Sequence, residues 1–251
     1  MTPGEAEATR FAADLNTLGI PAAVFPARDY VLRPIEGTAR EYEYRRLAVL
    51  GELVGGRLRA VAVPAEALTQ FTTPKEDFCA NTRTLHAGDT LLRDDLLAAL
   101  FGAGYTRRAR VDGPGQFSVR GDIVDIFAPD QKMPVRMEFW GDEIDTLHTF
   151  DLTTQRREDA IDKFYLSPAR EVLFGKPADA AEQLRAFLAK QRGKKKTAMA
   201  DCMAADLDLL DGGAVPVNMD KYLVVRYPHP ATVLDYFYDP ILVAEEPASI
   251  R

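Results

Sequence analysis

The chain has 251 residues, of which 47% are hydrophobic and 27% are charged, and its formal net charge at pH 7 is -7. This composition is ordinary for a soluble globular protein with one large domain or two smaller ones. The acidic excess argues against tight, nonspecific binding to duplex DNA, because such binding depends on Lys and Arg side chains that neutralise phosphates. The sequence has neither a signal peptide nor the apolar run of roughly 20 residues that a membrane helix needs. We therefore expect a soluble, cytoplasmic protein, and we expect it to be a monomer.

The first 79 residues show helical and strand patterns in turn. Apolar residues recur every three or four positions in the expected helices, whereas the expected strands are short apolar runs. These elements are expected, in chain order, at residues 5–19, 22–25, 40–53, 58–63 and 64–68. Alternation of this kind is typical of a parallel sheet covered by helices.

Residues 80–157 carry a different pattern. A strand is expected at 82–86 and a helix at 92–100. Four short strands follow between Gly113 and Arg157, and Gly-Asp and Pro-Asp pairs mark the turns between them. We therefore predict a compact α+β unit in which a helix packs against an antiparallel sheet.

The last part of the chain returns to mixed helices and strands. The expected elements are strands at 164–166, 222–225 and 241–244 and helices at 180–190 and 199–210. Neither flank alone has enough strands for a stable parallel sheet. We therefore predict that residues 1–79 and 158–251 form one discontinuous α/β domain into which residues 80–157 are inserted. The two cysteines, Cys79 and Cys202, are predicted to be buried thiols in a reducing cytosol.

The third strand of the middle unit carries the only tryptophan of the chain. By the period of two, its apolar residues share one face, and the other face carries Arg136, Glu138 and Trp140. Two explanations of this Trp stay open from the pattern alone. Either a neighbouring segment covers the ring, or the ring belongs to a partner-binding patch, because Trp and Arg are enriched at interface hot spots.

The motifs of common catalytic sites are absent from the sequence. No glycine-rich loop ends in Gly-Lys-Ser/Thr, so the phosphate loop of an ATPase is missing. The three histidines lack metal-ligand spacing, and neither the serines nor the cysteines lie in a nucleophile motif. The run from Lys194 to Lys196 is expected in a solvated loop between two helices. We therefore assign no catalytic, cofactor-binding or metal-binding residue.

Three segments of the chain resemble a known family. They are PGQFSVRGDIVDIFAP, PVRMEFWGDEIDTLHTFDLTTQRR and YLSPARE, and they are similar to the module shared by UvrB and the bacterial transcription-repair coupling factor family (Mfd). The segments SPAREVLF and LDYFYDPILVAEEPA are more similar to the coupling factors. UvrB has a long aromatic hairpin that clamps damaged DNA, and the matching stretch here, Pro26 to Ala39, is too short to form it. The chain is thus identified as similar to the N-terminal, UvrB-like region of the coupling factors.

This resemblance implies a fold and a function. The outer domain is expected to be a degenerate, RecA-like α/β domain without ATPase motifs, and the inserted α+β unit is expected to recruit UvrA in transcription-coupled nucleotide excision repair. The residues that match the family's UvrA contacts are Arg120, Arg136 and Trp140, and we expect all three side chains to be exposed. Trp140 stands where the family usually has Phe.

The resemblance also assigns other activities to the full-length protein. That protein resembles an ATP-dependent DNA translocase, so ATP, magnesium, DNA and RNA polymerase are expected as its ligands and partners and not as those of this chain. Two alternatives remain open. The chain could be a UvrB-like module that contacts DNA directly, or a nucleotide-hydrolysing domain with an unrecognised site.

Overall fold

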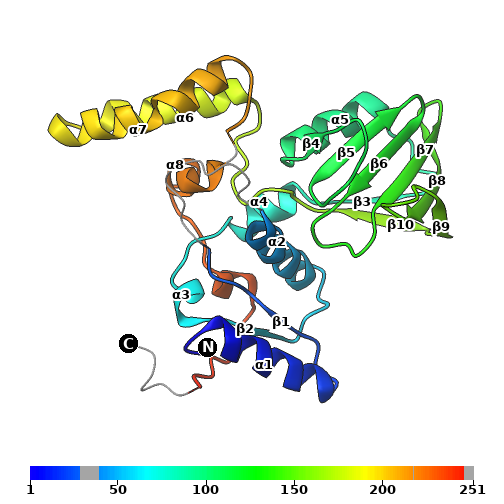
Figure 1. Cartoon of the computed structure of the whole chain (residues 1–251), viewed down its shortest axis with the longest axis horizontal. Coiled ribbons are helices and arrows are strands. Elements are labelled where there is room, and N and C mark those ends of the chain that lie inside the picture. Colours follow the sequence, from blue (N-terminus) through cyan, green and yellow to red (C-terminus); the bar gives the residue numbers. More distant parts are fainter. Residues whose placement is uncertain (29–39, 217, 246–251) are drawn as a thin grey trace.

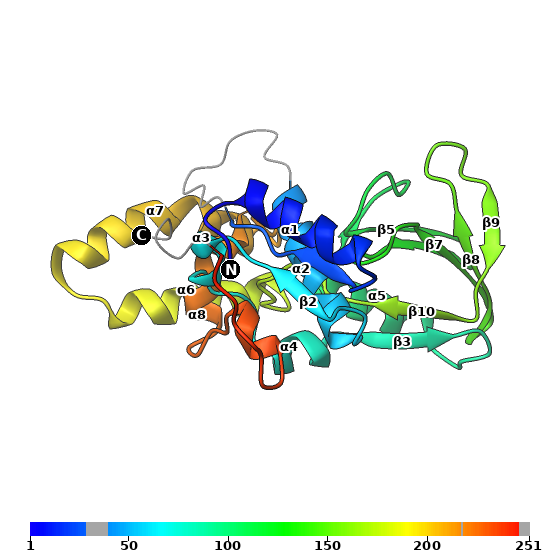
Figure 2. The ribbon, with the colours of Figure 1, turned by 90° about the horizontal axis from the view of Figure 1, so that it is seen from below.

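A computed structural model describes residues 1–28, 40–216 and 218–245 of the chain, with only the backbone of Lys195. Figures 1 and 2 both place the large sheet and the helices α6 (Pro177–Lys190) and α7 (Gly193–Asp211) on opposite sides of an N-terminal region. The stretch Pro26 to Ala39, whose short length favoured the coupling factors over UvrB, lies mostly outside the described residues. Within the described ranges, no helix is both long and apolar enough to cross a membrane.

The N-terminal region alternates helices and strands as predicted. Its elements are α1 (Glu5–Thr17), β1 (Ala22–Val24), α2 (Glu41–Val54), β2 (Ala60–Ala62), α3 (Ala65–Leu68) and α4 (Lys75–Ala80). β1 and β2 pair in parallel, and α2 buries Leu47 and Leu50 against Phe25. Val233 and Tyr236, from near the other end of the chain, lie in the same hydrophobic cluster, so the two flanks pack together.

The middle unit is built on an antiparallel sheet, and the four predicted strands are all present. In spatial order the strands are β4 (Thr106–Arg107), β5 (Gln116–Arg120), β6 (Ile123–Phe127), β7 (Val135–Trp140), β8 (Glu143–Phe150) and β9 (Arg157–Ala160). Neighbours are antiparallel except β4 and β5, which are parallel. Helix α5 (Arg93–Gly102) buries Leu96 and Leu100 in the same cluster as Phe117 and Met137 of the sheet. One face of the sheet is therefore a core face.

A β-bulge in β8 keeps this core face continuous. Glu138 of β7 lies opposite Thr146, but the next residue, Phe139, lies opposite Ile144, so one residue of β8 has no partner. The bulge shifts the alternation by one residue. As a result Ile144 and Leu147 are both buried in the core although they are three residues apart.

The core of the middle unit continues past residue 157, where we predicted its end. Strand β3 (Arg83–His86) pairs with β10 (Lys163–Leu166), which follows the sheet in the sequence. Phe164, Leu166 and Ala169 lie in the same hydrophobic cluster as α5. The chain leaves this unit only after β10.

The regular elements of the C-terminal part are all helical in the described residues. It consists of α6 (Pro177–Lys190), α7 (Gly193–Asp211), the 3-10 turn η1 (Met219–Tyr222), α8 (Leu223–Arg226) and a second 3-10 turn, η2 (Val233–Tyr236). Lys194 and Lys196, expected in a loop, lie in the first turns of α7. The prediction that both cysteines are buried is wrong, because Cys79 and Cys202 are exposed. Cys79 follows the buried Phe78, and Cys202 precedes the buried Met203, so in each case the neighbouring residue faces the core.

Two of the strand predictions for this part are wrong. Residues 222–225 are helical, and Leu223 and Tyr227, four residues apart, are both buried, as on one side of a helix. Residues 241–244 form no strand, and Ile241 is 92% exposed. The parallel sheet of the described residues therefore has two strands, β1 and β2. The fold is mixed α/β with several sheets, and the RecA-like detail stays a prediction.

A buried ionic cluster joins the flanks where the chain leaves the sheet unit. The carboxylate of Glu171 is fully buried and pairs with the guanidinium groups of Arg28 and Arg46, of which Arg46 is also fully buried. The Nε atom of Arg46 lies 2.7 Å from Oε1 of Glu171. Thr72 donates a hydrogen bond to the same oxygen over 3.1 Å. The sequence analysis did not predict this cluster.

Candidate partner-binding surface

The face of the sheet that points away from α5 carries a row of polar residues. Ser118 of β5, Asp125 of β6, Arg136 of β7 and His148 of β8 lie directly opposite one another across four strands. Cross-strand neighbours of this kind are close enough for their side chains to interact. The alternation that fills the core face with apolar residues therefore also aligns these polar groups.

Asp125 and Arg136 form a buried, two-point ion pair in this row. Asp125 is fully buried and Arg136 is 8% exposed. The Nε atom of Arg136 lies 2.7 Å from Oδ1 of Asp125, and Nη2 lies 3.0 Å from Oδ2. The guanidinium also lies 4.8 Å from the centre of the Phe150 ring. Paired, parallel N–H donors of this kind make the strongest contacts between Arg and a carboxylate.

The hairpin turn between β8 and β9 covers Arg136. Its residue Gln155 has a φ of 60°, and the carbonyl of Gln155 accepts a hydrogen bond from Nη1 of Arg136 over 3.2 Å. At the start of the turn, the carboxylate of Asp151 accepts hydrogen bonds from the backbone N–H groups of Thr153 and Thr154. These bonds lower the pKa of Asp151, with the Thr154 N–H as the main cause. The turn therefore holds its carbonyl over the buried guanidinium.

Trp140 lies at the open end of the same face. It is the last residue of β7, and its side chain is 82% exposed. Arg120, the last residue of β5, is 48% exposed and donates a hydrogen bond from Nη2 to Oδ2 of Asp125 over 2.7 Å. Arg157 of β9 is also about half exposed and pairs with Glu138, but it lies opposite Phe150, at the other end of the sheet. We call Arg120 and Trp140 the open-end surface.

The three predicted contact residues therefore differ in exposure. The prediction of an exposed Trp140 is confirmed, and no neighbouring segment of the described chain covers its ring. Arg120 is exposed as well, but the expectation of an exposed Arg136 is wrong. Arg136 is on the predicted face, and the hairpin turn at Gln155 closes over it, which strand alternation alone could not show.

Sequence reasoning missed Asp125 altogether. The signal was available, because Asp125 is the one charged residue in the otherwise apolar strand Ile123–Phe127. A lone carboxylate on a buried strand requires a partner, since burial of an unpaired charge is unfavourable. Its partners, Arg120 and Arg136, are both predicted contact residues, whereas Asp125 is not.

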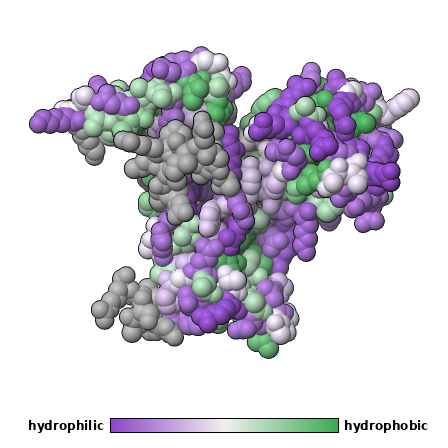
Figure 3. Space-filling model, in the orientation of Figure 1, coloured by the Kyte–Doolittle hydropathy of each residue, from purple (hydrophilic) through white to green (hydrophobic). Residues whose placement is uncertain are grey.

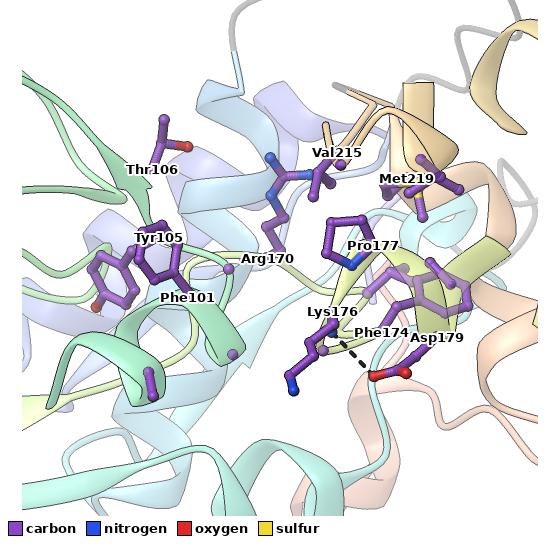
Figure 4. Close-up of a pocket in the computed structure, with 18 of the residues that line it drawn as sticks. Phe101, Tyr105, Thr106, Arg170, Phe174, Lys176, Pro177, Asp179, Val215 and Met219 are labelled. Carbon is purple, nitrogen blue, oxygen red and sulfur yellow. Dashed lines mark hydrogen bonds between the residues drawn. The ribbon is translucent and has the colours of Figure 1, made fainter. Parts of the chain in front are cut away.

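A pocket of about 880 Å³ lies elsewhere, between the sheet unit and the helix pair α6 and α7. Figure 3 shows the hollow between these two parts, and Figure 4 shows Phe101, Tyr105 and Phe174 around it. Arg170 also lines the pocket, and burial, followed by the nearby charge of Arg40, lowers its pKa to about 10. The described lining residues include no His, Cys or Ser.

The pocket therefore offers little catalytic chemistry. Its one carboxylate, Asp179, accepts a hydrogen bond from the backbone N–H of Lys176 as the cap of its own helix. In the described ranges, no three His, Cys, Asp or Glu side chains are grouped as metal ligands would be. The open-end surface is the stronger candidate site, because it exposes an aromatic ring and a cation at the same end of a rigid sheet.

Comparisons with known proteins agree with the resemblance found in the sequence. Residues 84–172 match the family model of the UvrB interaction domain, and this range includes the whole open-end surface. The chain is 28% identical over 255 residues to a transcription-repair-coupling factor of Bacillus subtilis, which covers 98% of this chain and 22% of that protein. A coupling factor of Myxococcus xanthus is 39% identical over 119 residues, covering 47% of this chain and 10% of that protein.

A third relative is the UvrABC system protein B of Chlorobium limicola. It is 27% identical over 245 residues, which cover 92% of this chain and 36% of that protein. The predicted resemblance is therefore confirmed: residues 84–172 match the UvrB interaction domain, and the chain is similar to transcription-repair-coupling factors over most of its length. It spans about a fifth of the Bacillus relative.

Proposed function

We propose that this chain is a non-catalytic module that recruits UvrA in transcription-coupled nucleotide excision repair. The single observation that carries the proposal is the 82% exposure of Trp140, at the same end of the sheet as the exposed Arg120 and inside the range that matches the UvrB interaction domain. Exposed Trp and Arg side chains grouped on one surface are typical of interface hot spots.

The sheet supports this role because it fixes the backbone on which the ring stands. β7 is hydrogen-bonded on both sides, to β6 and to β8, and Phe139, next to Trp140, is buried in the core. A side chain on such a rigid element loses little further backbone freedom on binding, and preorganisation of this kind favours affinity. The ring is thus held ready for an apolar recess on UvrA.

The same proposal leaves the energy-consuming steps to other parts of a longer protein. The chain spans only 22% of the Bacillus coupling factor, and ATP hydrolysis, DNA translocation and binding to RNA polymerase would come from the remainder of such a protein. A role in DNA repair agrees with the cytoplasmic location that the sequence predicts. Isothermal titration of the chain with ATP and magnesium should show no saturable binding.

The test of the proposed function is a binding titration with purified UvrA. Loss of a buried aromatic anchor commonly costs about 2 kcal/mol, which corresponds to roughly thirtyfold in affinity. We therefore expect Trp140→Ala to weaken UvrA binding at least roughly thirtyfold with an unchanged melting temperature. Tyr238→Ala is the matched control, because Tyr238 is 98% exposed and lies outside the sheet unit. Equal UvrA affinity of wild type and Trp140→Ala would refute the proposal.

A further inference from the structure

Three charged groups meet at the open-end surface, and only Arg120 among them is largely exposed. Asp125, fully buried, accepts hydrogen bonds from both Arg136 and Arg120. Its Oδ2 atom is shared, at 3.0 Å from Nη2 of Arg136 and 2.7 Å from Nη2 of Arg120. Arg136 is 8% exposed, whereas the side chain of Arg120 is 48% exposed.

Arg136 has little left to offer a partner. Its Nε and Nη2 atoms both donate to Asp125, and Nη1 donates to the carbonyl of Gln155. The Phe150 ring lies under its guanidinium. A partner could reach this group only by displacing the hairpin turn. The geometry therefore separates Arg136 from the surface that binds.

Arg120 is in the opposite situation. It ends β5 beside the turn at Gly121, and among the described residues its side chain bonds only to Asp125, through Nη2. A long Arg side chain at the end of a hairpin otherwise samples many rotamers, and fixing it on binding is unfavourable. The bond to Asp125 fixes the guanidinium before a partner arrives and leaves its outer edge in solvent.

We propose that Asp125 is a positioning residue: held by Arg136, it orients Arg120 at the end of the sheet that also carries Trp140, and the partner contacts Arg120 and Trp140 but neither Asp125 nor Arg136. This inference rests on the proposed function for the identity of the partner. The buried pair has a second consequence, because Arg136 compensates the charge of Asp125 and leaves the positive charge of Arg120 for the partner. Arg136 thus acts on binding only through the two groups above it.

The test is a double-mutant cycle on UvrA binding, measured by isothermal titration. Asp125→Asn keeps the shape of the side chain but removes its charge, and we expect it to weaken binding about tenfold, as for a charge-assisted hydrogen bond. In the Arg120→Ala background the same change should alter binding by less than about twofold, because the group that it positions is gone. Equal weakening in both backgrounds would overturn the inference, since Asp125 would then act through the fold and not through Arg120.

A second measurement needs no partner. The Nε–Hε signal of Arg120 in ¹⁵N NMR reports how ordered its guanidinium is in the free protein. We expect Asp125→Asn to lower this order, whereas Asp122→Asn, a change at an 80% exposed carboxylate in the neighbouring turn, should leave it unchanged. Unchanged order of Arg120 in Asp125→Asn would refute the positioning role. If Asp125→Asn does not fold, Arg136→Lys, which keeps a buried cation but loses the two-point contact, takes its place in both measurements.

The proposed function and the positioning role of Asp125 can be refuted independently of each other. Equal UvrA affinity in wild type, Trp140→Ala and Arg120→Ala would refute the proposed function, and the NMR comparison alone would then decide whether Asp125 orders Arg120. A strong effect of Trp140→Ala together with no coupling between Asp125 and Arg120 would keep the function and remove the positioning role.

Discussion

Glu171 is the residue whose loss should destabilise the fold most clearly. Its carboxylate is fully buried and pairs with both Arg28 and Arg46. Removal of one partner from a buried ion pair costs about 3 to 5 kcal/mol, because the remaining charge loses its compensation in a medium of low polarity. In domains of this size each kcal/mol lowers the melting temperature by roughly 2 to 4 °C. We therefore expect Glu171→Ala to lower the melting temperature by roughly 6 to 20 °C.

The assay is differential scanning calorimetry, supported by urea unfolding followed by circular dichroism. Glu171→Gln, which keeps an oxygen that can accept the hydrogen bonds from Arg46 and Thr72, should lose less stability than Glu171→Ala. Glu182→Ala, on the exposed side of α6, is the control and should change stability by less than about 0.5 kcal/mol. A melting temperature of Glu171→Ala within about 2 °C of wild type would refute the reasoning, since a buried charge would then have lost its partner at almost no cost.

Two further predictions concern acid stability and backbone strain. Burial raises the pKa of Asp130, so this carboxyl group binds a proton more readily in the folded protein than in the unfolded chain. The free energy of unfolding should therefore rise, through this group, as pH falls toward the ordinary carboxyl pKa of 3.8. Asp130→Asn should remove that part of the pH dependence of the unfolding free energy and Asp122→Asn should not; identical pH profiles of wild type and Asp130→Asn would contradict this cause. Gly104 and Gly88 both have a positive φ, but a Cβ atom would lie 2.8 Å from the Arg170 side chain at Gly104 and would meet nothing within 4 Å at Gly88. Gly88→Ala should cost only the backbone strain of a positive φ, about 1 to 2 kcal/mol. Gly104→Ala should destabilise the protein more, because its Cβ atom would also clash with Arg170. Equal melting temperatures of the two variants would show that Arg170 moves aside freely.

Local pattern predicted the sheet unit well because its signals are local. Alternation along β7 correctly placed Arg136 and Trp140 on the face opposite the core, and turn residues correctly separated β5 from β6. The burial of Arg136 depends on a turn nineteen positions away, at Gln155, with a backbone conformation that no periodicity reveals. The face was therefore predictable from the sequence, and the exposure of each residue on it was not.

Predictions failed where an apolar run was too short to specify its own structure. Residues 222–225 are predicted as a short buried strand, but they are helical, and Leu223 packs in the cluster of α6 and α7. Tertiary packing overrides propensity in such short segments. The ionic cluster could not be predicted either, because Arg46 and Glu171 are 125 positions apart and no local pattern indicates that they pair.

The central claim is that the exposed ring of Trp140 becomes buried against UvrA. The chain has a single tryptophan, so incorporation of 5-fluorotryptophan gives one ¹⁹F signal that belongs to this residue alone. We expect a large difference between the signal in H₂O and in D₂O for the free protein, because the ring is 82% exposed, and we expect that difference to disappear when UvrA is added. A complex with UvrA, shown to form by isothermal titration, in which the signal still responds fully to D₂O would contradict the claim.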